Sequence, residues 1–323
     1  MSESKPVVLV TGANGFIGRH LASALLGGGW AVRGAVRRPE AIGDAVVIES
    51  IGPETDWRAA LAGVSAVVHL AARVHHKHEE HAVNLYRKIN IEGTLHLARS
   101  AARAGVRHFI FVSTVLVHGR SNEGRAPFSE DDVLTPRGLY GMSKAVAEAE
   151  LRTLARDSAM KISVIRPPLV YGAGAKGNFA LLTRAVNLGL PLPFAAIRNQ
   201  RAFLAVQNLS SFILHRLAHP DSMSNFEIFL VADSQQISTP DFIERLGRAS
   251  GKSPRLFRVQ PQLLSSLFRM IGQQDTHDSL LCSLELNISK AIATGWKQQI
   301  SLDTGLLLAL SVQNAGGFPS DCH

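Results

Sequence analysis

The segment Pro6–Arg38, PVVLVTGANGFIGRHLASALLGGGWAVRGAVRR, sets the fold of this chain. It opens with a short β-branched apolar run, Val7–Val10, which is typical of a buried parallel strand. A glycine-rich turn, Thr11–Gly18, leads into an apolar-periodic helix over Phe16–Leu26, and a second strand is predicted over Ala31–Val36. A strand, a glycine-rich turn, a helix and a strand within about thirty residues form the context that a dinucleotide-binding fingerprint requires.

Each glycine of the turn has a predicted role. Gly12 allows the tight turn, Gly15 lets the backbone approach a pyrophosphate, and Gly18 lets the helix lie close to the strand. The N-terminus of the following helix offers N–H groups and a positive dipole end to phosphates. The spacing here is G-x-x-G-x-x-G rather than the commoner G-x-G-x-x-G, so the strand and helix on either side carry much of the prediction.

The composition is that of a globular protein of one large or two modest domains, with 323 residues, 46% of them hydrophobic and 19% charged. No apolar run approaches the roughly 18 residues that suggest a membrane span, and the first ten residues lack a signal-peptide pattern. Two cysteines, Cys282 and Cys322, indicate a reducing compartment with no disulfide framework or metal site. We therefore expect a cytoplasmic protein.

The net charge of +8 comes from scattered basic residues, with no Lys/Arg run longer than Arg37-Arg38. A solvated basic surface explains most of this charge. Among ligands, small anions such as pyrophosphates are favoured over nucleic acid, because no basic stripe or aromatic platform is visible.

Strands and helices alternate through the first half of the chain. This order predicts an α/β fold with a Rossmann-type, doubly wound parallel sheet over residues 1–166, with ligands at the carboxyl ends of the strands. The rhythm changes after residue 166, so residues 167–323 are predicted to form mainly a smaller C-terminal substrate-binding lobe, with some segments returning to the first domain. The further strands expected in the first half are Ala45–Ile51, Val64–Leu70, Val106–Ser113 and Ile162–Ile165, and the long helices are Ala82–Ala104 and Tyr140–Arg156.

The end of the second strand bears on the choice between two dinucleotides. An acidic side chain there accepts hydrogen bonds from ribose hydroxyls, whereas an arginine pairs with a 2′-phosphate. The chain reads Gly34-Ala35-Val36-Arg37-Arg38, without a carboxylate. Arg37 and Arg38 therefore favour NADP(H), and NAD(H) is the alternative cofactor. If the two arginines have no part in cofactor binding, they are simply solvated loop residues. Arg19 and Arg33 are weaker candidates for the same phosphate.

Tyr140 and Lys144 form a Y-x-x-x-K pair at the start of a predicted helix. A spacing of four places both side chains on one helical face. A neighbouring ammonium is expected to lower the pKa of the tyrosine, so that Tyr140 can exchange a proton with a substrate oxygen. Thr114, at the end of the preceding strand, is the candidate for holding that oxygen, and Ser113 is the alternative. Without a catalytic role, either hydroxyl would only cap backbone groups.

These motifs together resemble the extended short-chain dehydrogenase/reductases, within them the branch of nucleotide-sugar epimerases and reductases similar to UDP-glucose 4-epimerase. The resemblance rests on T-G-x-x-G-F-I-G at Thr11–Gly18, H-L-A-A at His69–Ala72, Thr114 and Tyr140-x-x-x-Lys144. It covers nearly the whole chain.

The resemblance implies roles for two sets of residues. Those that would line the dinucleotide are Gly12, Asn14, Gly15, Phe16, Ile17, Gly18, Leu70, Ala71, Ala72, Tyr140, Lys144 and Pro167. Those that would contact a nucleotide sugar are Val74, Lys176, Asn178, Phe179 and Arg201. Thr114, Tyr140 and Lys144 would be catalytic. The chain departs from the family pattern at Ser50, His118 and Gln207, where the family usually or often has Asp, Tyr and Asp, and this puts the adenine contact and local sugar contacts in doubt.

The resemblance implies two chemistries that share one site. One is an NADPH-dependent reduction of the C4 ketone of a UDP-4-keto-6-deoxy-(N-acetyl)hexosamine for bacterial surface polysaccharide, which Arg37 favours. The other is a UDP-glucose or UDP-N-acetylglucosamine 4-epimerase that recycles NAD in place. A non-catalytic dinucleotide-binding scaffold is the third reading, and the complete set of Thr114, Tyr140 and Lys144 weighs against it.

The resemblance also implies a homodimer, formed through the helices Ala82–Ala104 and Tyr140–Arg156 of each subunit. The histidines of His75–His81 invite a metal-site interpretation, but a solvated loop at the substrate mouth explains them better. Leu302–Leu310 could pack on a partner or a membrane surface, although a terminal core helix is the commoner explanation.

Overall fold

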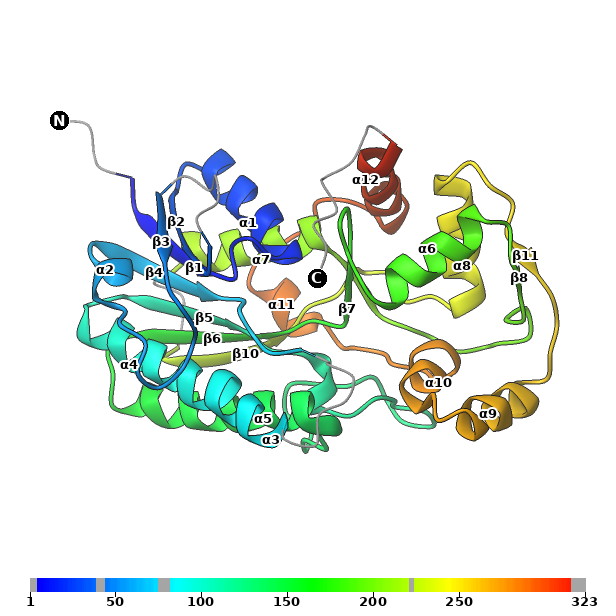
Figure 1. Ribbon diagram of the computed structural model, residues 1–323, viewed down its shortest axis with the longest axis horizontal. Helices are drawn as coiled ribbons and strands as arrows, with labels where there is room; N and C mark the ends of the chain where they lie inside the picture. Colours follow the sequence, from blue (N-terminus) through cyan, green and yellow to red (C-terminus); the bar gives the residue numbers. More distant parts are fainter. Residues whose placement is uncertain (1–4, 39–43, 75–81, 221–223, 315–323) are drawn as a thin grey trace.

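The computed structural model describes residues 5–38, 44–74, 82–220 and 224–314. A seven-stranded sheet with only parallel pairings forms its centre, in the order β10-β6-β5-β4-β1-β2-β3, and helices cover both faces (Figure 1). Its strands are β1 Val7–Thr11, β2 Ala31–Val36, β3 Asp44–Val47, β4 Val64–His69, β5 His108–Val112, β6 Lys161–Arg166 and β10 Phe226–Leu230. The predicted doubly wound α/β fold is confirmed.

Two layers of helices bury the apolar faces of this sheet. On one side lie α1 (Phe16–Gly27) and α7 (Val206–Ala218); on the other lie α4 (Thr94–Arg103) and α5 (Gly138–Arg156) (Figure 1). The central strands are buried on both faces, since four of the five residues of β1 and all five of β5 are buried, and this explains their continuous apolar sequence. A short helix, α2 (Arg58–Leu61), precedes β4.

The second half of the chain divides its elements between the sheet and a smaller core. The strand β10 pairs with β6, α7 packs on α1, and α11 (Ser289–Ala293) places Ala291 in the core beneath α7. The smaller core gathers aromatic side chains, with the rings of Phe203 and Phe242 stacked at 4.1 Å. The elements of this part are β7 Leu169–Tyr171, α6 Asn178–Asn187, β8 Pro191–Leu192, β9 Phe203–Ala205, α8 Thr239–Ala249, β11 Arg255–Leu256, α9 Pro261–Met270, α10 Gln274–Leu281 and α12 Leu302–Asn314.

The long helix expected over Ala82–Ala104 is interrupted. It begins as α3 (Ala82–Tyr86), widens to a π-helix over Arg87–Gly93, and continues as α4. Gly93 lies in the widened turn, where a Cβ atom would approach Ile51 Cγ2 to 2.7 Å. The strand expected over Ala45–Ile51 is also shorter, since β3 ends at Val47. The histidines of the segment 75–81 lie outside the described residues.

Candidate active site

The glycine turn between β1 and α1 has the geometry that close backbone approach requires. Gly12 has φ +70°, and a Cβ there would lie 3.1 Å from the backbone N of Ala71. At Gly18 a Cβ would lie 2.2 Å from the carbonyl oxygen of Gly12, so only glycine fits between helix and turn. Gly15, by contrast, is exposed and caps α1 without a side-chain hydrogen bond. The turn therefore fits a dinucleotide pyrophosphate, with Gly15 as the open position.

A buried polar chain fixes the strand ends behind this turn. Thr11 Oγ1 lies 2.7 Å from His69 Nδ1, and the other ring nitrogen of His69 lies 3.0 Å from Thr94 Oγ1. Burial lowers the pKa of His69 to about 3, so the ring is neutral. The Thr11 hydroxyl also accepts a hydrogen bond from the backbone N–H of Ala71. This chain positions Leu70, Ala71 and Ala72, all partly exposed, beside Gly12.

Asn90 extends the connection to α5. Its side chain accepts from the backbone N–H of Arg73 at 2.8 Å and donates to the carbonyl oxygen of Arg73 and to Ser143 Oγ. Ser143 in turn donates to the carbonyl oxygen of Tyr140. The widened π-turn around Asn90 thus ties the loop after β4 to the first turn of α5.

Lys144 and Tyr140 lie where α5 meets the carboxyl end of β5. Lys144 is 1% exposed; its Nζ donates to the carbonyl oxygen of Val112 at 2.8 Å and sits 4.2 Å from the Phe111 ring centroid. A Cβ on Gly141 would lie 3.0 Å from the carbonyl oxygen of Leu116, so the first turn of α5 packs directly on the turn that follows Thr114. The structure therefore brings the ends of β5 and α5 together, as expected.

The expected pKa relation within the pair is wrong in this state of the protein. Burial raises the pKa of Tyr140 to about 12, and burial lowers the pKa of Lys144 to about 7, an effect that Glu148 partly offsets. The ammonium of Lys144 is directed to the carbonyl of Val112 rather than to a phenolate. Desolvation is the main cause of both shifts, because each charged form loses water in this site.

The end of β5 is held by an ion pair that the sequence analysis missed. Glu148 and Arg166 are 3% and 2% exposed and are 2.6 Å apart at closest approach. Glu148 also accepts the hydroxyl hydrogen of Ser113, which leaves Thr114 as the outer hydroxyl at this strand end. Thr114 Oγ1 accepts from the N–H of Leu116 at 3.2 Å, so it caps the following 3₁₀ turn, Val115–Val117, and keeps its own hydrogen to donate.

Further contacts fix this corner of the site. Arg166 Nη1 lies 2.9 Å from His118 Nε2, and burial lowers the pKa of His118 to about 4. Pro167, which is buried, accepts a hydrogen bond from the N–H of Val115. The signal for Glu148 was present in the sequence, since it follows Tyr140 and Lys144 at a spacing of four on the same helix.

Three arginines near β2 have different surroundings. Arg37 and Arg38 are exposed just beyond the strand. Arg33 pairs with Asp44 at 2.6 Å and donates to the carbonyl oxygen of Ala62, so it ties β2 to β3 and to the end of α2. Of these three, Arg37 and Arg38 have exposed side chains available to a phosphate.

The residues predicted for the nucleotide sugar fall into two groups. Asn178 and Arg201 line one small cavity of about 30 Å³ between α6, α8 and α10. Lys176 and Val74 are exposed, and Phe179 is 1% exposed in the aromatic core beside Tyr171. Asn178 and Arg201 are therefore together, and the Phe179 side chain is a packing residue here.

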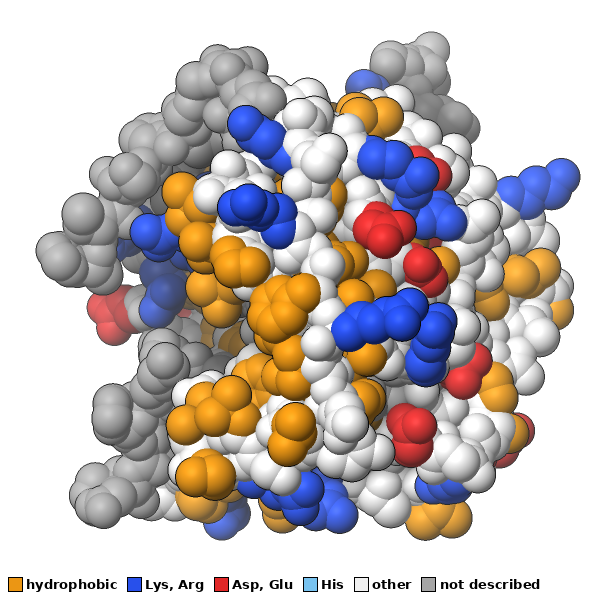
Figure 2. Space-filling view, turned by 90° about the vertical axis from the view of Figure 1, so that its right-hand side faces the viewer, with side chains coloured by type: hydrophobic (Ala, Val, Ile, Leu, Met, Phe, Trp, Pro, Cys, Tyr) orange, Lys and Arg blue, Asp and Glu red, His pale blue; other side chains and the backbone are white. Residues whose placement is uncertain are grey.

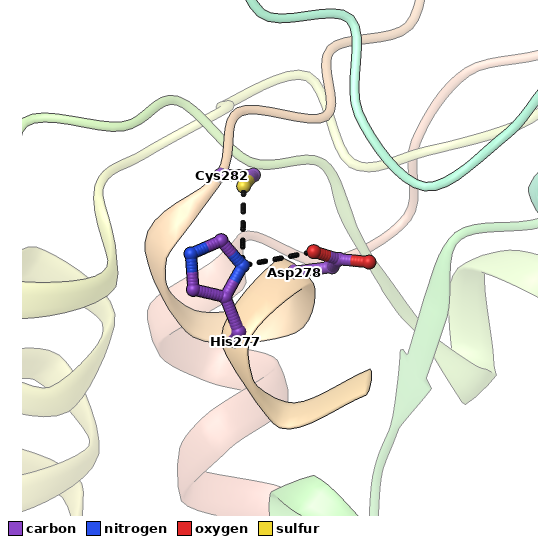
Figure 3. A group of neighbouring side chains, drawn as sticks. All are labelled: His277, Asp278 and Cys282. Carbon is purple, nitrogen blue, oxygen red and sulfur yellow. Dashed lines mark hydrogen bonds and ion pairs between the residues drawn. The ribbon is translucent and has the colours of Figure 1, made fainter. Parts of the chain in front are cut away.

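Helix α10 closes the Arg201 side of that cavity. Arg201 donates to the carbonyl oxygens of Asp278 and Cys282, and burial lowers its pKa to about 10. His277, Asp278 and Cys282 bring one possible metal-ligand atom each to within 4.8 Å of the others (Figure 3). Burial raises the pKa of the Cys282 thiol, which disfavours the thiolate that a metal needs. The Arg201 guanidinium, bound to the carbonyl oxygens of Asp278 and Cys282, repels a cation. The cluster is better suited to hydrogen bonding than to holding a metal.

Residues 8–232 match the NAD dependent epimerase/dehydratase family. The chain belongs to this family. It is 36% identical over 305 residues to the UDP-glucose 4-epimerase of Vibrio cholerae, covering 92% of each chain, and 25% identical over 322 residues to the GDP-6-deoxy-D-mannose reductase of Pseudomonas aeruginosa, covering 94% and 96%. The solved structure of MoeE5 in complex with UDP-glucose and NAD has a TM-score of 0.76 at 23% identity, covering 95% and 98%.

The chain is therefore an enzyme of the NAD-dependent epimerase/dehydratase family. Of the helices in the described part of the chain, none combines the length and apolar character that crossing a bilayer requires.

Proposed function

We propose that this enzyme transfers hydride at C4 of a UDP-linked sugar, as an NADPH-dependent reductase of a UDP-4-keto-6-deoxy-(N-acetyl)hexosamine. The observation that supports the reductase is the exposed pair Arg37 and Arg38 beyond β2, in a strand end without a carboxylate. A guanidinium there can bind a 2′-phosphate bidentately, and a reductase must reload its cofactor from the free pool.

The chain's own residues supply positioning and proton transfer. Thr114 donates its hydroxyl hydrogen to the C4 oxygen and holds it beside Tyr140. A bound dinucleotide supplies the hydride that reaches C4. Tyr140 gives its proton to the same oxygen, so that the ketone gains one hydride and one proton and becomes an alcohol. When its amine is protonated, Lys144, one helical turn from Tyr140, offsets the charge of the phenolate that remains. The buried Glu148–Arg166 pair fixes α5 against the ends of β5 and β6.

A UDP-glucose or UDP-N-acetylglucosamine 4-epimerase is the second candidate. The Vibrio cholerae relative, 36% identical over 92% of each chain, carries the name UDP-glucose 4-epimerase. The same Tyr140 would then remove the C4 hydroxyl proton and return it after the sugar has turned over, with NAD retained throughout. The two candidates differ in whether the cofactor leaves the enzyme.

Identification of the dinucleotide released by denaturing the purified protein separates the two. A retained NAD, together with conversion of UDP-glucose to UDP-galactose or of the N-acetyl analogues, would establish the epimerase. An initially empty site that takes NADPH far more tightly than NADH, with consumption of NADPH by a 4-keto sugar nucleotide, would establish the reductase. Binding of a dinucleotide without turnover of either kind of sugar nucleotide would support the non-catalytic scaffold.

Two variants sharpen this test. Tyr140→Phe is expected to lose at least about a hundredfold in turnover while keeping its dinucleotide affinity. Arg37→Gln/Arg38→Gln is expected to weaken NADPH about tenfold or more, with NADH unaffected. Arg107→Gln, an exposed arginine before β5, is the matched control. Equal NADPH affinity in the double variant and the control would contradict a role for the pair.

We also propose that the enzyme is a homodimer. Apolar side chains stand out on neighbouring helices of one face, with Val83 on α3 59% exposed and Met142 and Val146 on α5 51% and 45% exposed. Light scattering is expected to give twice the mass of the 34.8 kDa chain, and Val146→Glu is expected to reduce it to one chain. A single-chain mass for the wild type at micromolar concentration would contradict this.

A further inference from the structure

Helix α9 turns an apolar face away from the protein. Leu264 points inward at 5% exposure, whereas Leu263, Leu267 and Met270 are 62%, 52% and 85% exposed. Ile271, directly after the helix, is 56% exposed. The four exposed side chains are spaced i, i+4, i+7 and i+8, so they share one side of the helix. We call these four residues the α9 face.

The surroundings of the α9 face are basic. Residues 245–274 contain six Lys or Arg and no Asp or Glu. Arg245 is paired with Asp303, while five others are exposed: Arg248, Lys252, Arg255, Arg258 and Arg269. Asp275, the next acidic residue along the chain, is already paired with Arg120. Figure 2 looks onto this end of the molecule, where apolar side chains gather, basic side chains lie beside them, and acidic side chains lie among the basic ones on the right.

We propose that the α9 face docks on an anionic lipid bilayer. Exposed leucine and methionine on one side of a helix, with arginines at its flanks, are the features of helices that lie in a membrane interface. The ten residues of α9 span about 15 Å, half the thickness of a bilayer core, so the helix lies on the surface and does not cross it. The apolar side chains enter the acyl boundary, and Arg255, Arg258 and Arg269 meet lipid phosphates.

Charge distinguishes this occupant from a second copy of the chain. Two α9 faces meeting each other would bring the exposed arginines beside both helices into contact, and the like charges would repel. An anionic lipid surface has the opposite sign and attracts basic segments by about 1 kcal/mol for each Lys or Arg. A flat bilayer also accommodates a convex helix without a shaped groove.

The docked helix is next to the candidate substrate cavity. Helix α9 packs on α10, and the Ser265 hydroxyl on α9 lies 3.0 Å from His277 Nε2 on α10. The backbone of α10 holds Arg201, so one helix separates the bilayer surface from the Arg201 side chain. This inference goes beyond the proposed reaction and does not depend on which sugar is the substrate.

The test is co-sedimentation of the full chain with vesicles. Binding is expected to phosphatidylcholine vesicles containing phosphatidylglycerol, to weaken as salt is raised, and to be weak with pure phosphatidylcholine. Arg255→Gln/Arg258→Gln is expected to reduce the partition coefficient roughly 25-fold, about fivefold for each charge removed. Arg107→Gln/Arg137→Gln, which removes two exposed arginines elsewhere, is the matched control.

A second pair of variants tests the apolar face. Leu267→Glu/Met270→Glu is expected to reduce binding at least about tenfold, whereas Val133→Glu, at a site as exposed as Met270 (85%), is expected to leave binding unchanged. Equal binding to anionic and neutral vesicles, or equal loss in Val133→Glu, would overturn the proposal. Failure of the wild-type chain to bind anionic vesicles would also overturn it. In that case, a lower mass of Leu267→Glu/Met270→Glu in light scattering would assign the α9 face to a second copy of the chain, and loss of binding to an acidic protein in this variant would assign it to a protein partner.

Discussion

At the scale of single residues, Lys144 is an amine in a place that penalises its charge. It is 1% exposed and lies between the Val112 carbonyl and the Phe111 ring. Burial lowers its pKa to about 7 from the ordinary value of 10.5. A lysine that titrates near neutral pH can change charge during a catalytic cycle, which an exposed lysine does not do.

This pKa shift makes stability depend on pH. Between about pH 7 and 10.5 the unfolded chain binds a proton at Lys144 that the folded chain does not, so stability rises with pH across this window. Lys144→Met removes the effect. In the cofactor-free protein we expect the difference in unfolding free energy between wild type and Lys144→Met to shift in favour of wild type by up to about 1.4 kcal/mol per pH unit. Urea denaturation from pH 7 to 10 measures this difference. The same dependence of unfolding free energy on pH in wild type and Lys144→Met would contradict the prediction.

The Glu148–Arg166 pair makes a second residue-scale prediction. Glu148→Gln leaves the buried guanidinium of Arg166 without its countercharge, which typically costs about 3–5 kcal/mol. The exposed Glu150, two residues along the same helix, is the control, and Glu150→Gln is expected to change stability by less than about 0.5 kcal/mol. Urea denaturation of both variants measures the difference. A similarly small loss of unfolding free energy in Glu148→Gln and Glu150→Gln would mean that Arg166 finds another partner.

At the scale of elements, the glycine turn joins β1 to α1 through contacts that leave no room for a side chain. Gly18→Ala places a methyl group 2.2 Å from the Gly12 carbonyl oxygen, so helix and turn must separate. We expect lower thermal stability and a loss of dinucleotide affinity of at least about tenfold. In Gly27→Ala, at the end of the same helix, the Cβ meets nothing within 4 Å, and stability is expected to hold or rise slightly. Calorimetric dinucleotide titration compares the two.

The elements also show how far the sequence alone can lead. Long periodic segments such as α1 and α5 and the glycine turn were predictable, because hydrophobic period and turn chemistry are local properties. The π-turn at Arg87–Gly93 was not, because it is bound up with hydrogen bonds from Asn90 to Arg73 and Ser143, which are far apart in sequence. Helix α10 was not predicted, because it has no buried residue and no apolar stripe that would indicate a helix. The pairing of Arg166 with Glu148 could not be predicted either, because it depends on the tertiary contact between β6 and α5.

At the scale of the whole molecule, Asp233 joins the seven-stranded sheet to the smaller core. It follows β10, is 1% exposed, and accepts hydrogen bonds from the Tyr171 hydroxyl, the Asn208 amide and the Ala205 backbone. Asn208 also holds the backbone of Ile300, which leads into α12. One carboxylate therefore connects the sheet, the β7–β9 pair and the C-terminal segment.

Removing this carboxylate is expected to uncouple the two parts. In Asp233→Ala the buried Tyr171 hydroxyl and Asn208 amide lose their acceptor, at a cost of about 3 kcal/mol, and the smaller core is expected to unfold at a lower temperature than the sheet. Calorimetry would then show two transitions where the wild type shows one. Asp241→Asn, which changes an exposed residue in the first turn of α8, should keep a single transition. If Asp233→Ala also unfolds in one transition at the wild-type midpoint, then apolar packing between the two cores, and not this polar junction, makes the molecule cooperative.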